Sequence, residues 1–249
     1  MGNTPRNQQS HLPLEINLLT LNCWGLLHLS ALRTQRLAEI GRQIASTAKS
    51  TTSTSPSASP TPHIVCLQEC WVQEDYEAIR SATHHILPHG KFYANGLLGA
   101  GLAILSKWPI IESDMRSYPL NGRPSAFFRG DWYAGKGIAS AVIQFGPGKG
   151  DIVEVFNTHT HAPYGTKPHS QYTAHRTAQA WLLAKLLRAA SQRGNLVLAM
   201  GDFNMLPLSF AHRLITSHSP VRDPRRSLRN LTTIIAYSRA QRQRQRRHE

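Results

Sequence analysis

One short stretch, Leu196–Asn204, limits the fold more than any other part of this sequence. Its apolar run predicts a buried strand, and the run ends in Gly-Asp-Phe-Asn. Residues two apart in an extended chain point to the same side, so we expect Asp202 and Asn204 to project together from the strand end. A carboxylate beside an amide can hold a water next to a phosphate oxygen. Gly, Asp and Asn are also common turn residues, so a plain turn after the strand is the alternative.

The length and composition allow a sizeable core. The chain has 249 residues, 41% of them hydrophobic, which fits one large domain or two small ones. No stretch approaches the ~20 apolar residues of a membrane-spanning helix, and the N-terminus has no apolar signal segment. We therefore expect an intracellular protein, cytoplasmic or peripheral on membranes. The three cysteines, Cys23, Cys66 and Cys70, lack zinc-site spacing, so we expect reduced thiols in or near the core.

The chain is strongly basic, with a net charge of +14. Nine Arg against one Asp and one Glu fall between Arg222 and Glu249, so this segment holds half of the excess. A basic chain favours anionic partners, either nucleic acid or an anionic membrane surface. The charge alone does not choose between them.

Gly and Pro clusters divide the chain into short elements. We expect a catalytic domain over 14–223, and no regular structure in the polar leader 1–13, the Ser/Thr/Pro-rich insertion 46–62 and the basic tail 224–249. The expected strands are Ile16–Leu21, His63–Gln68, Gly101–Ser106, Ile110–Tyr118, Ile138–Phe145, Ile152–Thr158 and the run into Gly201. The expected helices are Arg33–Ser46, Tyr76–His84 and Ala174–Ala190, the last with Trp181, Leu182, Leu186 and Leu187 on its apolar side.

Polar residues at the ends of the expected strands share one chemical theme. Glu69 follows the apolar strand that ends at Gln68, and Asn22 follows the first strand. A carboxylate emerging from a buried strand needs a partner, and a divalent cation is one option. Mg²⁺ takes few protein ligands, prefers oxygen donors and keeps water or phosphate for the rest. Glu69 with Asn22 as a neutral oxygen donor meets that demand.

Two further segments are suited to contacting a phosphate. His159 and His161 share one face of an extended segment, and His159 is the stronger choice for hydrogen-bonding a phosphate oxygen. The alternative is a pair of hydrogen-bonded surface histidines. In Asp131–Gly137 a Gly-flanked Lys136 follows Asp131, so its ammonium and backbone N–H groups can neutralise a phosphoryl group. The alternative is a glycine hairpin with a solvated lysine, and the spacing is not that of a Walker A loop.

Five motifs in this order resemble the neutral, Mg²⁺-dependent sphingomyelinases, and most of all the fungal inositol phosphosphingolipid phospholipases C. These belong to the endonuclease/exonuclease/phosphatase superfamily. The resemblance covers about Leu14 to Asp223. The motifs are Leu21–Trp24, Leu67–Trp71, Gly130–Gly137, Asn157–Tyr164 and Gly201–Asn204.

The resemblance implies a role for each site residue. Glu69 binds Mg²⁺ with Asn22 beside it, and Asp131 with Lys136 forms the pair in the phosphate-side loop. His159 contacts the phosphodiester. Asp202 orients the attacking water and the phosphate, together with Asn204. The implied substrate is a sphingolipid at a membrane surface, and anionic phospholipids fit the basic charge as further partners.

The sequence departs from the family after Val221–Asp223. The family carries a Ser-Asp-His element on a final strand, and its His is the general base that the resemblance implies. Here the only later histidine, His248, follows Arg247 instead of Asp. We therefore expect impaired catalysis and a sandwich that is incomplete at its C-terminus. The Gln- and Arg-rich ending suggests an altered reading frame or an alternative splice product.

The resemblance implies an α/β fold, a four-layer α/β/β/α sandwich of the DNase I-like type. The implied reaction is Mg²⁺-dependent hydrolysis of sphingomyelin or inositol phosphosphingolipids to ceramide and a phosphorylated headgroup. A nuclease or phosphatase of the same superfamily is the first alternative, although no base-stacking aromatic platform is evident. The second alternative is an inactive fragment that binds anionic lipid or RNA through its Arg residues.

Overall fold

The computed structural model describes residues 12–13, 15–50, 60–95, 99–122, 133–163, 172–218 and 233–237. Its elements follow one another as β1 (Leu18–Asn22), α1 (Arg33–Ser50), β2 (Ile64–Gln68), α2 (Gln73–Thr83), β3 (His89–Tyr93), β4 (Leu102–Ser106), β5 (Ile110–Ser117), β6 (Gly137–Gln144), β7 (Ile152–His159), α3 (Thr173–Gln192), β8 (Leu196–Asp202), α4 (Phe210–His218) and β9 (Thr233–Tyr237).

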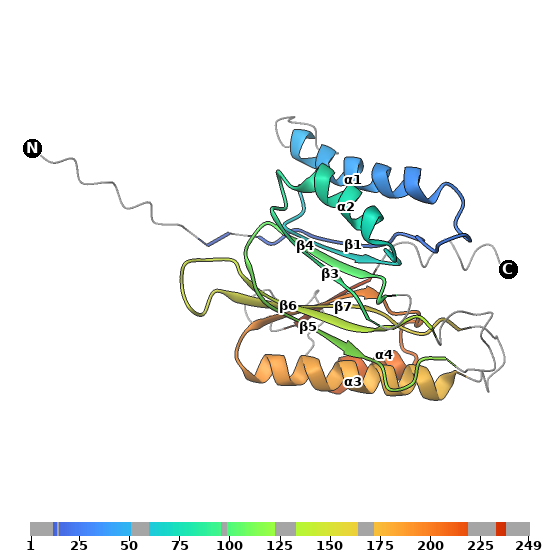
Figure 1. The fold of residues 1–249 in the computed structure, drawn as a ribbon. Coiled ribbons are helices and arrows are strands. Elements are labelled where there is room, and N and C mark those ends of the chain that lie inside the picture. Colours follow the sequence, from blue (N-terminus) through green and yellow to red (C-terminus); the bar gives the residue numbers. More distant parts are fainter. Residues whose placement is uncertain are drawn as a thin grey trace, which may run out of the picture.

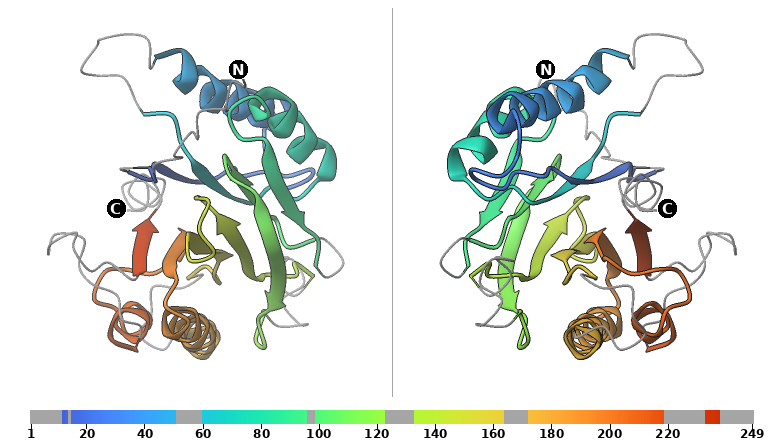
Figure 2. Two further views of the ribbon diagram at one scale, coloured as in Figure 1. Left: turned by 90° about the vertical axis from the view of Figure 1, so that its left-hand side faces the viewer. Right: turned by 90° about the vertical axis from the view of Figure 1, so that its right-hand side faces the viewer.

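The strands form two mixed sheets that face each other. The first has the order β1-β2-β4-β3 and the second β5-β6-β7-β8-β9. Helices α1 and α2 cover the outer face of the first sheet, and α3 and α4 cover the outer face of the second (Figures 1 and 2). This arrangement confirms the predicted α/β/β/α sandwich.

Three apolar layers hold these elements together. The layer between the sheets includes Cys66 and Ile104 from the first sheet and Val155 and Met200 from the second. A second layer packs the first sheet against α1 and α2, and a third packs the other sheet against α3 and α4. Central strands such as β2 are buried on both faces, which explains why they read as continuous apolar runs. The three cysteines are buried and free, as predicted.

Helix α3 turns a different face to the core than its large side chains indicated. Trp181, which we expected on the apolar side, is 49% exposed, whereas Leu183 is fully buried. Small residues such as Ala180 and Ala184 share the buried stripe, and they let the helix lie close to the sheet. Among the described residues, no helix combines the length and apolarity needed to cross a bilayer.

The expected insertion 46–62 begins later than predicted, because α1 continues to Ser50. The hydroxyls of Ser46 and Thr47 donate to the carbonyls of Gln43 and Ile44, one turn back. These polar residues are therefore compatible with the helix instead of ending it. Residues 51–59 lie outside the described part, as do residues 1–11 of the expected leader.

The basic tail contains a strand where we expected no regular structure. β9 pairs in parallel with β8, in a register that sets Thr233 against Val197 and Tyr237 against Gly201. The Thr-Ile-Ile-Ala-Tyr sequence of β9 is rich in residues that favour strands. The rest of the tail lies outside the described residues.

A buried ion pair on β7 gives the first prediction, which concerns the pH dependence of stability. Glu154 is 5% exposed and accepts hydrogen bonds from Arg193 and Asn195. Burial alone would raise the pKa of Glu154, but these hydrogen bonds and the Arg193 charge outweigh burial and hold the pKa below its usual value. A lowered carboxyl pKa contributes stability at neutral pH that is lost as the pH falls through the folded-state pKa.

We therefore expect Glu154→Gln to lower the free energy of unfolding by about 1–2 kcal/mol at neutral pH, since contact of Arg193 with solvent weakens the pair. The difference from wild type should shrink as the pH approaches about 4. Urea unfolding at several pH values measures it. The control is Asp114→Asn, whose carboxylate pairs with Arg116 at 60% exposure and should change stability by less than about 0.5 kcal/mol. A loss that is independent of pH would contradict the prediction.

Candidate active site

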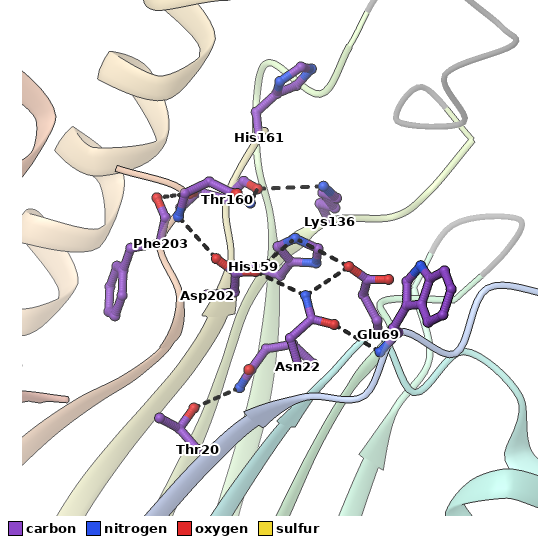
Figure 3. Close-up of polar contacts among 12 residues, drawn as sticks. Thr20, Asn22, Glu69, Lys136, His159, Thr160, His161, Asp202 and Phe203 are labelled. Atoms are coloured by element: carbon purple, nitrogen blue, oxygen red, sulfur yellow. Dashed lines mark hydrogen bonds and ion pairs between the residues drawn. The ribbon is translucent and has the colours of Figure 1, made fainter. Parts of the chain in front are cut away.

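The site lies where four strands of the two sheets end at the same edge of the sandwich. Asn22 is the last residue of β1, and Glu69 directly follows β2. His159 ends β7 and Asp202 ends β8, and these two residues are register partners. Their side chains point toward one another across the space between the sheets (Figure 3). The structure therefore brings together four of the residues that the sequence singled out.

The amide of Asn22 links the two carboxylates of this group. Its Nδ2 donates to Glu69 Oε1 at 2.7 Å and to Asp202 Oδ2 at 2.9 Å. Its Oδ1 accepts from the backbone N–H of Trp24 at 2.9 Å. We expected Asn22 to offer an oxygen to a cation, but the amide nitrogen faces the carboxylates. An N–H₂ group between two carboxylates occupies the place where a cation would balance their charges.

Glu69 is held at the site by an unusual backbone conformation. Its φ angle is +54°, in the left-handed region that non-glycine residues rarely adopt. The Glu69 carbonyl accepts a hydrogen bond from the N–H of Gly25 at 2.8 Å, which holds the β1–α1 connection against it. Glu69 is 6% exposed, and its Oε2 is buried with no hydrogen-bond partner among the described residues. A buried carboxylate oxygen of this kind indicates a site for a cation or a donor from a ligand.

His159 faces both carboxylates without hydrogen-bonding to either. Its Nε2 lies 4.0 Å from Glu69 Oε1 and 3.8 Å from Asp202 Oδ2. The imidazole is 7% exposed, so the surface-histidine alternative is wrong for this residue. A ring nitrogen at this distance from two carboxylates can contact a group bound between them.

Asp202 and Asn204 lie together, but not because the chain stays extended. β8 ends at Asp202, and Asn204 has a φ angle of +44°. This turn brings the Asn204 N–H to 3.2 Å from Asp202 Oδ1, and its Nδ2 donates to the carbonyl of Thr160 at 3.0 Å. The chain therefore leaves the extended conformation after Asp202, and the Asn204 side chain is held against the Thr160 carbonyl.

Lys136 lies at the same edge, directly before β6. It is 5% exposed, so the solvated-lysine alternative is wrong. Its Nζ lies 3.5 Å from the Thr160 carbonyl, one residue beyond His159 (Figure 3). This position brings its ammonium group to the same edge of the sandwich as His159. Asp131, predicted as its companion, lies outside the described residues.

His161 does not join the site. Its ring is fully buried and stacks on Tyr172 with 4.0 Å between ring centroids. Its backbone N–H donates to Gln179 of α3 at 2.8 Å. The side chain points away from Asp202 in Figure 3. The period of two applies only while the chain is extended, and β7 has ended by this point.

A buried amide pair beneath the site was missed by the sequence analysis. Gln68 Nε2 donates to Asn157 Oδ1 at 2.8 Å, and Asn157 Nδ2 donates to the carbonyls of Leu67 and Ala103. Gln68 and Asn157 are fully buried and belong to different sheets, so the pair ties the sheets together. Their positions next to Glu69 and two before His159 were the only signal in the sequence.

Two cysteines on or just after β2, Cys66 and Cys70, are excluded as nucleophiles of the site. Burial raises the pKa of Cys70 to about 12, with Asp75 adding to the shift, and burial likewise raises the pKa of Cys66. These thiols stay protonated at neutral pH, so they are not nucleophiles. No group of three or more His, Cys, Asp or Glu side chains in the described part of the chain is arranged to enclose a metal. The site offers two carboxylates, an amide and an imidazole, a donor set that suits an ion with few protein ligands.

The chain is similar in sequence to a known family and to several known proteins. The sequence profile of the Endonuclease/Exonuclease/phosphatase family matches residues 19–246. The chain is 48% identical over 209 residues to the inositol phosphosphingolipids phospholipase C of Schizosaccharomyces pombe, covering 84% of this chain and 46% of the relative. It is 30% identical over 210 residues to sphingomyelin phosphodiesterase 2 of Rattus norvegicus, covering 84% and 46%. The chain thus spans about half the length of these relatives.

Solved structures share the fold at low sequence identity. Sphingomyelinase C from Streptomyces griseocarneus superposes with a TM-score of 0.60 at 16% identity, over 84% of this chain and 70% of that one. A beta toxin mutant from Staphylococcus aureus, solved with bound magnesium ions, gives 0.55 at 17% identity, over 82% and 70%. The profile match, the sandwich and the convergence of these strand ends lead to one conclusion: this chain belongs to the endonuclease/exonuclease/phosphatase family.

Proposed function

We propose that this protein is a Mg²⁺-dependent phosphodiesterase of the phospholipase C type. Its substrates would be sphingomyelin or inositol phosphosphingolipids, and its products ceramide and a phosphorylated headgroup. The similarity to the fungal phospholipase C and to the sphingomyelin phosphodiesterase supports this substrate class. We further propose a peripheral location on the membrane that holds the substrate.

One observation supports the proposal most. The carboxylates of Glu69 and Asp202, from different sheets, both accept hydrogen bonds from the Asn22 amide, and Glu69 Oε2 is buried with no hydrogen-bond partner in the described part of the chain. Such an arrangement is costly unless a ligand with positive charge or hydrogen-bond donors completes it. Glu69 would hold Mg²⁺, with Asn22 beside it once its amide turns its oxygen inward. When bound, the ion would stabilise the negative charge that develops on the phosphate.

The surrounding residues have separate tasks in this proposal. Asp202 orients the attacking water, with Asn204 steadying its carboxylate through a backbone N–H. His159 donates to a non-bridging oxygen of the phosphodiester, and Lys136 offsets its charge from the other side, with Asp131 as its companion. Water attacks phosphorus, and the bond from phosphorus to the ceramide oxygen breaks. The ceramide oxygen leaves as a hydroxyl after taking up the proton that the attacking water gives up.

The rate of the 249-residue chain depends on a general base. Between Asp223 and Glu249 the sequence holds no Asp-His pair, and His248 follows Arg247. General-base assistance is typically worth ~10²–10⁴ in rate. We therefore propose that this chain, assayed by itself, turns over slowly compared with a relative that carries the pair.

Hydrolysis assays on three substrates test the proposed function. Purified protein is incubated with sphingomyelin, inositol phosphosphingolipid or plasmid DNA, each with Mg²⁺ and with EDTA. We expect slow, Mg²⁺-dependent release of the phosphorylated headgroup from at least one lipid. Cleavage of DNA without lipid hydrolysis would assign the chain to the nucleases of its family. Absence of any turnover together with absence of Mg²⁺ binding in calorimetry would overturn the proposal.

A further inference from the structure

Large apolar side chains are unusually exposed around the site. Twelve such side chains are exposed among the described residues, and seven of them lie in two short segments, 23–32 and 203–210. Six form what we term the apolar rim: Leu27, Leu29 and Leu32 after β1, and Leu206, Leu208 and Phe210 after β8. Leu29 and Leu208, at 76% and 79% exposure, have almost no contact with the rest of the chain. Large exposed apolar patches mark interaction surfaces.

The two segments of the rim begin beside the candidate active site. Its two segments follow β1 and β8, whose last residues, Asn22 and Asp202, are hydrogen-bonded at 2.9 Å. Both segments therefore leave from the same point between the sheets, one on each side. The first runs from the site edge to the start of α1, seen at the right-hand end of Figure 1.

These segments carry no charge that a lipid surface would repel. Neither 23–32 nor 203–210 contains Asp, Glu, Lys or Arg, and half of the chain's net charge of +14 lies in residues 222–249. Anionic lipid headgroups attract basic proteins and repel carboxylates. The rim residues sit on two separate turns rather than along a groove. Separate turns can each enter a bilayer, whereas a protein segment needs a continuous surface to pack against.

We propose that the apolar rim inserts into the surface of a phospholipid bilayer, so that the Glu69–Asp202 site faces the headgroups. This inference rests on the proposed lipid substrate, which lies in such a bilayer. Insertion would remove the leucine side chains from water and hold the site at the depth of the phosphodiester. It also accounts for the placement of these leucines beside the site, where a soluble substrate would gain nothing from them.

Vesicle sedimentation tests the rim with a matched control. The vesicles contain phosphatidylcholine with about one fifth phosphatidylserine, no sphingolipid, and EDTA in the buffer. We expect Leu29→Ser with Leu208→Ser to weaken binding tenfold or more, because each substitution removes a large apolar side chain from the inserted surface. The control is Ile111→Ser with Trp181→Ser, which removes two side chains that are 49% exposed but lie outside the rim. The control should change binding less than about twofold.

A second readout locates the inserted end of the molecule. Trp24 lies beside the rim and is 42% exposed, whereas Trp181 on α3 is 49% exposed at a distance from it. Brominated lipids should quench wild-type fluorescence, Trp24→Phe should remove most of this quenching, and Trp181→Phe should leave it. Far-UV circular dichroism and thermal melting of every variant show whether it is folded.

Three outcomes would overturn the inference. The folded rim variant could bind vesicles as the control does. Vesicle binding could instead be lost at high salt and be unaffected by the rim substitutions. That result would show that basic residues alone hold the protein on the vesicle. Absence of vesicle binding, with a dimer in light scattering that the rim variant dissociates, would assign the rim to a protein partner. Because these assays need neither sphingolipid nor Mg²⁺, failure of lipid hydrolysis leaves their result intact.

Discussion

Glu69→Gln is expected to lower Mg²⁺-dependent phosphodiester hydrolysis about a thousandfold, because a catalytic metal supplies several kcal/mol and each 1.4 kcal/mol is a factor of about ten. Glutamine has the same shape and retains an Oε1 that can accept from Asn22 Nδ2. The change removes the charge and replaces Oε2, which is buried and has no hydrogen-bond partner among the described residues. Single-turnover assays measure the rate, and calorimetry measures the loss of Mg²⁺ affinity in parallel.

Glu74→Gln is the control for this prediction, since Glu74 is exposed in the first turn of α2, five residues further along the chain. It should leave both the rate and the Mg²⁺ affinity unchanged. Both variants should melt at the wild-type temperature, which separates a lost ligand from a lost fold. Wild-type Mg²⁺ affinity in the folded Glu69→Gln protein would show that the ion binds at a place other than Glu69.

Gly201→Ala is expected to destabilise the fold by about 3–5 kcal/mol, because both the backbone angle and the available space exclude a side chain. The φ angle of Gly201 is +142°, and an added Cβ would lie 2.0 Å from the carbonyl oxygen of Thr158 on β7. That oxygen is backbone, so it can move only if β7 and β8 separate. Urea unfolding measures the loss.

Two other glycines serve as controls that separate the cost of backbone strain from the cost of the steric clash. Gly194 has a φ angle of +83° but no neighbour within 4 Å of an added Cβ, so Gly194→Ala should cost only the backbone strain of about 1 kcal/mol. Gly150 has open space and no positive φ, so Gly150→Ala should stay within about 0.5 kcal/mol of wild type. Equal effects at all three positions would refute the steric explanation.

The fold followed from the sequence wherever burial on both faces produced a continuous apolar run. β2, β4 and β8 were located by such runs. β3, which reads His-Gly-Lys-Phe-Tyr and is mostly half-buried, carries neither a run nor an alternation, and it was missed. Helix α4 was missed because it is only nine residues long and directly follows a turn. β9 was missed because its conformation depends on pairing with β8, a strand that lies far away in the sequence.

The site was predictable to the level of which strand ends meet. Strands β7 and β8 are parallel, and so are β1 and β2, which places Asn22, Glu69, His159 and Asp202 at one edge. The orientation of the Asn22 amide was not predictable, because it depends on the Trp24 N–H and on carboxylates from both sheets. The roles of these residues in catalysis stay predictions until the variants are assayed.

The departure of His161 and the turn at Asn204 have a common cause. Strand periodicity was extended beyond the last strand residue in both cases, where hydrogen bonds to groups distant in the sequence decide the conformation. The side-chain amide of Asn204 donates a hydrogen bond to the Thr160 carbonyl, and the backbone N–H of His161 donates to Gln179 on α3. The pairing of Gln68 with Asn157 across the sheets was missed for a different reason, since the two residues lie within strands but are 89 positions apart.

The two carboxylates of the site come from successive halves of the chain, since the first sheet is complete by Ser106 and the second begins at Ile110. Any ligand that contacts both Glu69 and Asp202 therefore opposes separation of the two halves. At a hundredfold excess over its Kd, such a ligand would raise the free energy of unfolding by about 2.7 kcal/mol. Proteases cut chains that open transiently, so the supply of such a ligand would set how long the protein survives in a cell.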